Sequence, residues 1–215
     1  MDLASYLDHT LLKEDATDEQ LRELCKEAID FDFKGVCVYP RHLPLVALQL
    51  AGKRPLPVAV VDFPSGEKNA EAKAEETAEA IALGAKEIDM VINYKALIQK
   101  KYAQVYAEIR AVVCAAGEYP VKVILETCKL NYDEKVAACV LSVAADAAFV
   151  KTSTGFGGGG ATIEDIMLMR KIVPAGFGVK ASGGIRTGEM AIKMIEAGAD
   201  RIGTSSSVQI IKGGL

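Results

Sequence analysis

The chain has 215 residues, of which 50% are hydrophobic, so it can bury a continuous core and is not a disordered protein. Its 29 acidic residues slightly outnumber its 25 basic residues, which argues against a basic surface and against nucleic acid as a partner. His9 and His42 are too few and too far apart to indicate a zinc site.

Short β-branched runs alternate with longer amphipathic segments along the whole chain. The predicted strands are Tyr6 to His9, Val36 to Tyr39, Val58 to Asp62, Ile88 to Ile92, Val121 to Glu126, Ala147 to Lys151, Phe177 to Ala181 and Arg201 to Thr204. The predicted helices are Asp18 to Phe31, Arg41 to Ala51, Glu67 to Leu83, Ala96 to Ala116, Asp133 to Ala145, Ile163 to Ile172 and Glu189 to Ala197. Thr17 and Gln20 have the spacing of a capping box, which marks the start of the first helix.

The repeating unit is therefore a strand followed by a helix, and no linker or shift in composition divides the chain. We expect one domain over residues 1–215. The repeat predicts an α/β fold, a (β/α)8 TIM barrel, with a doubly wound open sheet as the alternative. In such a barrel the functional residues gather at the carboxyl ends of the strands.

The stretch from Ala147 to Thr162, AAFVKTSTGFGGGGAT, joins a buried strand to a polar loop. Its four apolar residues lead into Lys151, so an ammonium group lies at the end of a hydrophobic strand. A run of hydroxyl side chains ending at Thr154 and the glycines from Gly155 to Gly160 then let backbone and side chains approach a ligand. The loop offers an amine nucleophile and an anion cradle; the alternative is a surface lysine before a flexible linker.

Lys180 is placed in the same way, because apolar residues lead into it and glycines follow. Adjacent parallel strands lie about 4.8 Å apart, so the ammonium groups of Lys151 and Lys180 could come within roughly 5 Å. Repulsion of about 3 kcal/mol would lower the pKa of one lysine by roughly 2 units and leave it neutral near pH 7. The alternative is that each lysine pairs with a buried carboxylate.

Asp89 is a carboxylate on an otherwise apolar strand, which predicts a cationic partner or a role as an acid or base. Its alternative role is that of a fixed counter-ion for a lysine. Asp8 and Thr10, near the first strand, and Glu126, at the end of the fifth, are weaker candidates whose alternative is to anchor loops. Cys37 fits packing better than nucleophilic attack.

Two further loops have the composition of a phosphate site. Gly183 and Gly184 follow the seventh strand, and the run from Ile202 to Ser207 opens a short final helix after the eighth. Barrels often bind phosphate with these two loops. The alternative is that they are ordinary caps and turns.

The cysteines and the termini bear on location. The five cysteines lack CxxC spacing and lie mostly in apolar contexts, which indicates free thiols in a reducing compartment. Met1 and Asp2 are not followed by the pattern of a signal peptide. The longest nearly apolar run, Val136 to Val150, is too short to span a bilayer. We expect a cytoplasmic protein without membrane contact.

Several motifs together resemble the 2-deoxyribose-5-phosphate aldolase family. They are Leu7-Asp8-His9-Thr10, Glu87-Ile88-Asp89, Phe149-Val150-Lys151-Thr152-Ser153-Thr154-Gly155, Lys180 before Ser182-Gly183-Gly184-Ile185-Arg186-Thr187, and Gly203-Thr204-Ser205-Ser206. The resemblance runs from the first strand to the last. It implies a class I aldolase that reversibly cleaves 2-deoxy-D-ribose 5-phosphate to acetaldehyde and D-glyceraldehyde 3-phosphate, in deoxyribonucleotide catabolism.

The resemblance also implies roles for the matched residues. Lys151 would form the Schiff base, Lys180 would tune its reactivity, and Asp89 would relay protons through water. The phosphate contacts would fall on Gly155, Gly183, Gly184, Ser205 and Ser206, and we add Thr154, Asp8 and Thr10 as substrate-binding candidates. We expect no metal or other cofactor, and a homodimer or homotetramer as the assembly.

The chain departs from the family pattern at two places. Some members carry a lysine where this chain has Phe156, so phosphate binding here should rely more on backbone amides. Some members also end in a tyrosine that assists proton transfer, whereas this chain ends in Gly213-Gly214-Leu215. A tail-assisted step is therefore not implied.

A Schiff base suits the expected substrate, because acetaldehyde has about three heavy atoms and would bind no better than millimolar without covalent capture. The alternatives within enzymes are another Schiff-base aldolase or a transaldolase of the same fold. The alternative from a different class is a barrel that binds a phosphorylated ligand without catalysis.

Overall fold

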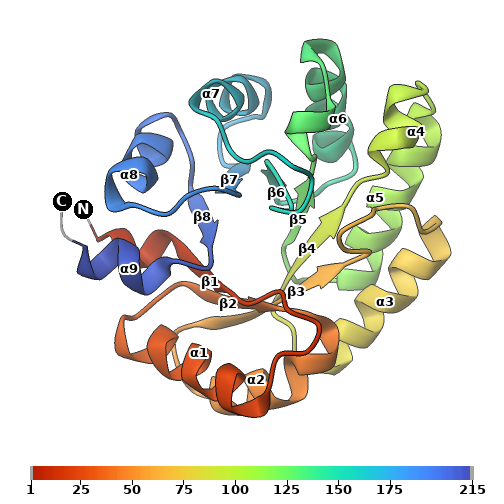
Figure 1. Cartoon of the computed structure of the whole chain (residues 1–215). Coiled ribbons are helices and arrows are strands. Elements are labelled where there is room, and N and C mark those ends of the chain that lie inside the picture. The colour runs from red at the N-terminus through yellow and green to blue at the C-terminus, as the bar shows by residue number, and fades with distance from the viewer. Residues whose placement is uncertain (1, 214–215) are drawn as a thin grey trace.

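The computed structural model describes residues 2–213 and has eight parallel strands that close into a barrel (Figure 1). Each strand pairs with its neighbours in sequence, and the first pairs with the last. The strands are β1 (Leu7–Thr10), β2 (Gly35–Val38), β3 (Leu56–Val61), β4 (Glu87–Val91), β5 (Val121–Ile124), β6 (Phe149–Lys151), β7 (Gly178–Ser182) and β8 (Arg201–Thr204). The predicted (β/α)8 barrel is confirmed, and the open sheet is excluded.

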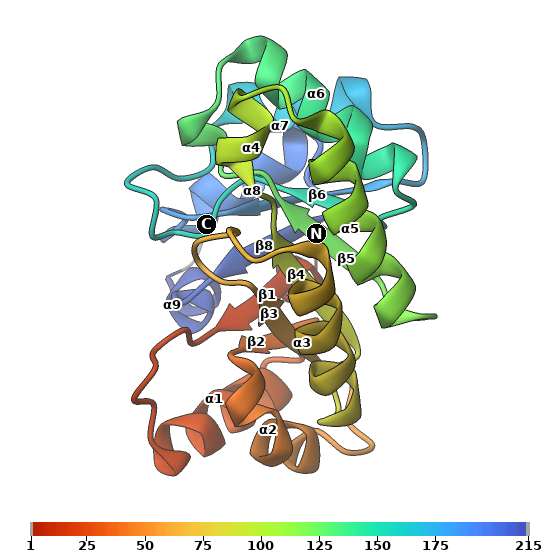
Figure 2. The same cartoon turned by 90° about the vertical axis from the view of Figure 1, so that its right-hand side faces the viewer.

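Helices surround the barrel, as the views along it and from its side show (Figures 1 and 2). They are α1 (Asp18–Asp30), α2 (Leu43–Gln49), α3 (Ala70–Ala82), α4 (Tyr94–Ile98), α5 (Tyr102–Ala116), α6 (Tyr132–Ala144), α7 (Ile163–Ile172), α8 (Gly188–Glu196) and α9 (Ser207–Lys212). Short 3-10 turns are η1 (Leu3–Tyr6), η2 (Pro40–His42) and η3 (Thr127–Lys129). Among residues 2–213, no helix has the length and apolar character needed to cross a membrane.

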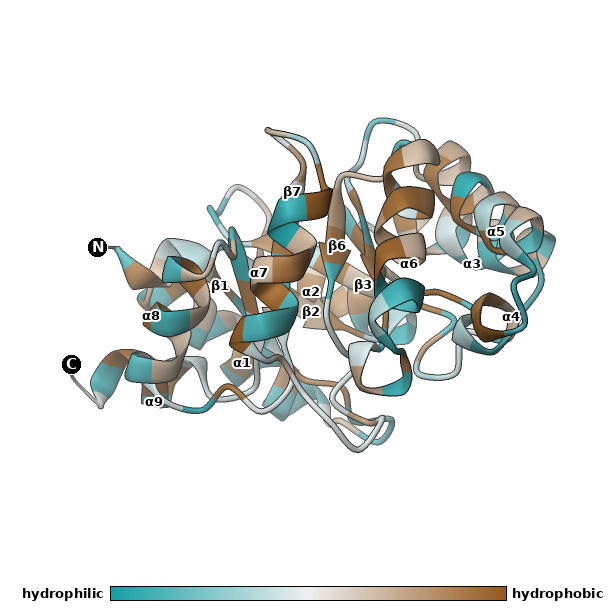
Figure 3. Ribbon diagram, turned by 90° about the horizontal axis from the view of Figure 1, so that it is seen from above, coloured by the Kyte–Doolittle hydropathy of each residue, from teal (hydrophilic) through white to brown (hydrophobic). Residues whose placement is uncertain are grey.

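The core lies between the strands and the helices. Every residue of β2, β4, β5, β7 and β8 is buried, because helices cover the outer face of the barrel and side chains fill its interior. Helices α7, α8 and α9 show alternating hydrophilic and hydrophobic bands, as amphipathic helices do (Figure 3). Charged side chains of these strands that point into the barrel are therefore buried and lie close to one another.

The helix starts follow the capping signals in the sequence. The capping box of Thr17 and Gln20 is formed, so α1 begins at Asp18 as predicted. Asn69 caps α3, which therefore starts at Ala70 and not at the predicted Glu67. The final helix after β8 is also present, as α9.

The single helix predicted over residues 96–116 is wrong. The segment forms α4 and α5, and the break falls at Lys100, whose φ of 58° is left-handed and cannot continue a helix. The predicted helix over residues 41–51 begins as the turn η2 and becomes α2 only at Leu43. Apolar periodicity continues across both breaks, so it could not reveal them.

Candidate active site

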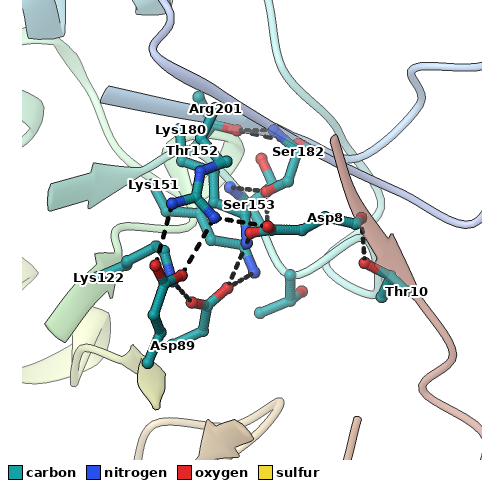
Figure 4. Close-up of polar contacts among 12 residues, drawn as sticks. Asp8, Thr10, Asp89, Lys122, Lys151, Thr152, Ser153, Lys180, Ser182 and Arg201 are labelled. Atoms are coloured by element: carbon teal, nitrogen blue, oxygen red, sulfur yellow. Dashed lines mark hydrogen bonds and ion pairs between the residues drawn. The ribbon is translucent and has the colours of Figure 1, made fainter. Parts of the chain in front are cut away.

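The two predicted lysines meet at one carboxylate inside the barrel. Lys151, the last residue of β6, is in register with Lys180 of β7, and both reach Asp89 of β4 (Figure 4). The Nζ atoms of Lys151 and Lys180 lie 2.7 Å and 2.8 Å from the same oxygen, Oδ2 of Asp89. The lysines are as close as their strands predict, but Asp89 lies between them and offsets part of their repulsion. These contacts match the alternative, in which each lysine pairs with a buried carboxylate.

More charged side chains extend this contact deeper into the barrel. Asp8 of β1 accepts hydrogen bonds from Lys180 at 2.5 Å and from Arg201 of β8 at 2.6 Å. Glu87 of β4 accepts from both NH groups of Arg201, at 3.0 and 3.1 Å, and pairs with Lys122 of β5 at 2.6 Å. Lys122 also lies 2.9 Å from the other oxygen of the shared carboxylate. We call these residues the ion-pair cluster: Asp8, Glu87, Asp89, Lys122, Lys151, Lys180 and Arg201.

The ion-pair cluster has four cationic side chains and three carboxylates, and no side chain in it is more than 6% exposed. Lys122, Lys180 and Arg201 each contact two carboxylates, whereas Lys151 contacts one. A surplus charge in a buried site costs free energy. The ion-pair cluster has one surplus positive charge when all its members are ionised, and Lys151 is the cation with the fewest carboxylate partners to offset it.

The neighbouring charges set the protonation of the other members. Burial alone would raise the pKa of Asp89, but the ammonium groups of Lys122, Lys151 and Lys180 outweigh it and hold that pKa well below its usual value. Burial would lower the pKa of Lys180, but the carboxylates of Asp8 and Asp89 raise it above its usual value. At neutral pH the resting site therefore has Lys180 protonated and Asp89 ionised.

A cavity of about 360 Å³ opens above Lys151 at the carboxyl ends of the strands. It is lined by these sequence-predicted residues: Thr10, Lys151, Thr154, Gly155, Gly183, Gly184, Ser205 and Ser206. Gly183 and Gly184 have φ values of 88° and 79°, a left-handed conformation that favours glycine. In the described residues, the N–H groups of Gly184 and Ser205 donate to no other protein group. The cavity thus combines an amine with free backbone donors.

The hydroxyl-rich loop is fastened to Glu126 at the end of β5. The Thr154 hydroxyl donates to the Glu126 carboxylate and accepts from the backbone N–H of Phe156 at 3.0 Å. Glu126 itself has a left-handed φ of 56° and directly precedes the turn η3. Glu126 therefore anchors a loop, which was the alternative for it, and the Thr154 hydroxyl is already engaged within the protein.

Other candidates lie below the cavity. Asp8 is fully buried and binds Lys180 and Arg201 within the ion-pair cluster, so it does not line the cavity as a substrate contact would. Cys37 is fully buried, and burial raises the pKa of its thiol to about 11, which fits packing and not nucleophilic attack. Gly214 and Leu215, at the tail, lie outside the described residues.

The sequence did not predict that Lys122, Glu87 and Arg201 belong to the ion-pair cluster. It also did not predict that Lys13 and Arg186 line the cavity. A signal for Lys122 was present, since it is the one polar residue of β5, VKVI. The same pattern of one polar residue among apolar ones is also expected for a strand in a sheet that has one solvent-exposed face. Only closure of the barrel shows that the alternate positions face inward.

The comparisons with known proteins agree with one another. Residues 3–212 match the family model described as DeoC/LacD family aldolase. The chain is similar to the deoxyribose-phosphate aldolase of Brevibacillus brevis, with 55% identity over 213 residues that cover 99% of this chain and 96% of that protein. The deoxyribose-phosphate aldolase of Clostridium tetani is 51% identical over 213 residues, 99% of both chains. The structure of deoxyribose phosphate aldolase from Aeropyrum pernix, described as tetrameric, matches with a TM-score of 0.91 and 34% identity, covering 98% of this chain and 90% of that one.

Proposed function

The chain belongs to the DeoC/LacD family of aldolases, and from this we propose that it cleaves 2-deoxy-D-ribose 5-phosphate reversibly to acetaldehyde and D-glyceraldehyde 3-phosphate. The reaction proceeds through a Schiff base on Lys151. One observation carries this assignment of the nucleophile: Lys151 is the cation of the ion-pair cluster with a single carboxylate contact, and it borders the cavity.

In the synthetic direction, the neutral amine of Lys151 adds to the carbonyl carbon of acetaldehyde, and the resulting carbinolamine loses water to give an iminium ion. A base removes a proton from the adjacent methyl group and leaves an enamine. The enamine carbon forms a bond to the aldehyde carbon of glyceraldehyde 3-phosphate, whose oxygen takes up a proton. Water then hydrolyses the iminium, releasing the sugar phosphate and restoring the amine.

Lys180 and Asp89 support this chemistry through charge and proton transfer. Lys180 keeps its positive charge 2.8 Å from the oxygen that Lys151 also contacts, and so favours the neutral form of the nucleophile. Asp89 keeps Lys151 oriented at 2.7 Å. With a water molecule in the cavity, Asp89 also relays the protons that the carbinolamine and enamine steps release and require.

The phosphate of the substrate binds to the loops after β6, β7 and β8. The free N–H groups of Gly184 and Ser205 supply hydrogen bonds, and Gly155, Gly183 and Ser206 border the same space. These backbone amides take the place of the lysine that some family members have at the position of Phe156. The side chains of Lys13 and Arg186 also line the cavity and add positive charge at its mouth.

Borohydride reduction in the presence of acetaldehyde tests the assignment. We expect mass spectrometry to find one added ethyl group, on Lys151. A protein that only binds a phosphorylated ligand would gain no mass. Label on Lys180 with Lys151 untouched would reverse the roles of the two lysines.

We further propose that the protein forms a homodimer or homotetramer; the tetramer is supported by analogy with the Aeropyrum pernix structure, which is described as tetrameric. Light scattering at micromolar concentration measures this directly, and a mass of one chain would contradict it. The cytoplasm is the proposed location, because the cysteines are free thiols and would stay reduced there.

A further inference from the structure

The ion-pair cluster reaches the end of the barrel that lies opposite the cavity. The cavity above Lys151 opens at the carboxyl ends of the strands. Glu87 and Arg201 are the first residues of β4 and β8, and Lys122 is the second residue of β5, so all three lie toward the amino ends. All three are also buried. The amino-terminal end of the barrel is therefore closed to water at these charges.

Phe149 lies at that end of the barrel, as the first residue of β6. It is in register with Lys122 of β5 on one side and with Gly178 of β7 on the other. The centroid of its ring lies 5.9 Å from Nζ of Lys122 and 5.8 Å from Cζ of Arg201. Phe149 is itself partly exposed. It therefore lies at the boundary between the buried charges and water.

The ring of Phe149 does not serve the apolar core. Within residues 2–213, neither of the two apolar clusters includes Phe149, although Ala147 and Val150 on either side of it belong to the large one. Side chains alternate along a strand, so Phe149 points into the barrel together with Lys151, while Val150 points out to the helices. The ring thus packs against cations where a core residue would pack against other apolar side chains.

Gly178 leaves the space that the ring fills. A Cβ atom at this position would overlap the ring of Phe149, so no larger residue fits while the ring stays in place. Unlike Gly183 and Gly184, Gly178 does not have a left-handed φ. Conformational freedom is therefore not the reason for a glycine here. The ring and the glycine on the neighbouring strand form a fitted pair.

Water at this end of the barrel would weaken the charge interactions of the cluster. The interaction of two charges falls in inverse proportion to the effective dielectric, which rises when water enters. The face of an aromatic ring also attracts cations, which offsets part of the cost of burying Lys122 and Arg201. A smaller side chain than that of Phe149 would leave a space beside polar groups, and such a space holds water.

The balance of charges around Lys151 gives the direction of the effect. Asp89 contacts Lys151 at 2.7 Å, which leaves no room for water between them. Beyond this contact, the cluster presents three cations and two carboxylates to Lys151, which is a net repulsion. Water screens these longer interactions more than the direct contact, and it also solvates the ammonium form. Water entry would therefore favour the protonated form of Lys151.

We propose that Phe149 is a positioning residue of the aldolase: its ring forms a floor that keeps water from the ion-pair cluster, so that the cations of the cluster act at full strength on Lys151. The proposal rests on the Schiff-base mechanism proposed above. Phe149 touches no substrate, because the cavity lies at the other end of the barrel. It acts on the protonation of the nucleophile and not on the binding of the sugar phosphate.

The test is the pH profile of borohydride trapping with acetaldehyde in variants of the floor. Phe149→Ala should raise the midpoint of trapping by about 1 unit, because a doubled effective dielectric halves the roughly 2 units that one net positive charge supplies. Phe149→Leu keeps a bulky apolar side chain and should shift the midpoint less. At a pH above both midpoints, the KM for 2-deoxyribose 5-phosphate should be unchanged. Tyr132→Ala removes a ring that is 66% exposed on α6 and serves as the matched control.

Several titratable groups face Lys151 and contribute to the wild-type profile. Inside the barrel and at its mouth they are Asp8, Lys13, Cys37, Glu87, Asp89, Lys122, Glu126, Lys180, Arg186 and Arg201. None of the substitutions in the floor changes any of these groups. A shift of the profile would therefore report a change in their surroundings and not the loss of a charge.

Two further variants change the floor from β7. Gly178→Ala keeps the ring but must displace it, so it should shift the midpoint in the same direction as Phe149→Ala. Phe149→Gly combined with Gly178→Phe returns a ring from the neighbouring strand and should bring the profile back toward that of the wild type. Circular dichroism checks folding, and Gly178→Ala decides the matter if Phe149→Ala does not fold.

The outcomes separate this proposal from the function it rests on. If acetaldehyde and borohydride do not label Lys151 in the wild type, the Schiff-base function fails. If they do, but the folded floor variants keep the wild-type profile or move the midpoint downward, the floor is overturned and the aldolase function stands. An equal shift in Phe149→Leu and Phe149→Ala would also overturn it, because the exclusion of water would then not be what the ring supplies.

Discussion

Replacing Lys180 with methionine tests whether its charge is what keeps Lys151 neutral. The Nζ atoms of the two lysines lie 2.7 Å and 2.8 Å from one oxygen of Asp89, so they are at most 5.5 Å apart, and at that separation and an effective dielectric near 20 their repulsion is about 3 kcal/mol. In Lys180→Met this repulsion is absent, so the protonated form of Lys151 should become more favourable. The pH midpoint of Schiff-base formation should rise by about 2 units, a loss on the order of a hundredfold near neutral pH.

The assay is the rate of borohydride trapping with acetaldehyde, measured across pH for the wild type and three variants. Lys180→Arg keeps the charge and should retain more of the wild-type profile than Lys180→Met. Lys122→Met also removes one positive charge, but from the far oxygen of Asp89, so it should shift the midpoint in the same direction by less. Circular dichroism checks that each variant is folded.

One result would refute this reasoning. If the folded Lys180→Met variant has the same trapping profile as the wild type, Lys180 is not the electrostatic partner, and a role in proton transfer or in structure would have to replace it. If Lys122→Met shifts the profile as much as Lys180→Met does, the net charge of the cluster matters more than the distance of the removed cation from Lys151.

Three further predictions follow from other parts of the structure. Gly184→Val places a β-branched residue at a φ of 79° beside the cavity and should raise the KM for deoxyribose 5-phosphate far more than that for deoxyribose; equal losses would contradict the phosphate site. Because the pKa values of Asp8 and Asp89 are lowered by folding, the free energy of unfolding in urea should be level above about pH 5 and fall below about pH 4, where the unfolded chain takes up protons first; a flat profile down to pH 3 would exclude this. A thiol reagent should react in the folded protein with Cys114 and Cys128, which are exposed, and more slowly at Cys128 because burial and the Glu126 carboxylate raise the pKa of its thiol; the three buried cysteines should react only on unfolding.

The sequence predicted correctly those features that depend on residues close together in the chain, such as the ends of strands and the starts of capped helices. The run AAFVK placed Lys151 at the end of a buried strand, and the structure has it as the last residue of β6. The same kind of pattern placed Lys180 and Asp89 on buried strands. Apolar runs and helix caps are local signals, so they can be recognised in the sequence without knowledge of the fold.

What the sequence could not predict depends on contacts between distant strands. Asp8 is a substrate-binding candidate from its motif, and nothing in the sequence indicated its contacts with Lys180 and Arg201, at sequence separations of 172 and 193 residues. The sequence does not single out Lys122, and it marks Glu87 only as part of a motif, because the alternation along one strand does not show which face is buried. Their burial follows only from closure of the barrel.

The charges of the ion-pair cluster are distributed unequally along the chain. Its carboxylates all come from β1 and β4, in the amino-terminal half of the barrel, whereas its cations all come from β5 to β8. During synthesis, the first half of the barrel would leave the ribosome with carboxylates that have no internal counter-ions. Two copies of the same half could not pair without burying like charges together, while unlike halves complement each other. The charges that serve the chemistry thus also oppose the pairing of two like half-barrels and favour the pairing of an amino-terminal half with a carboxyl-terminal half.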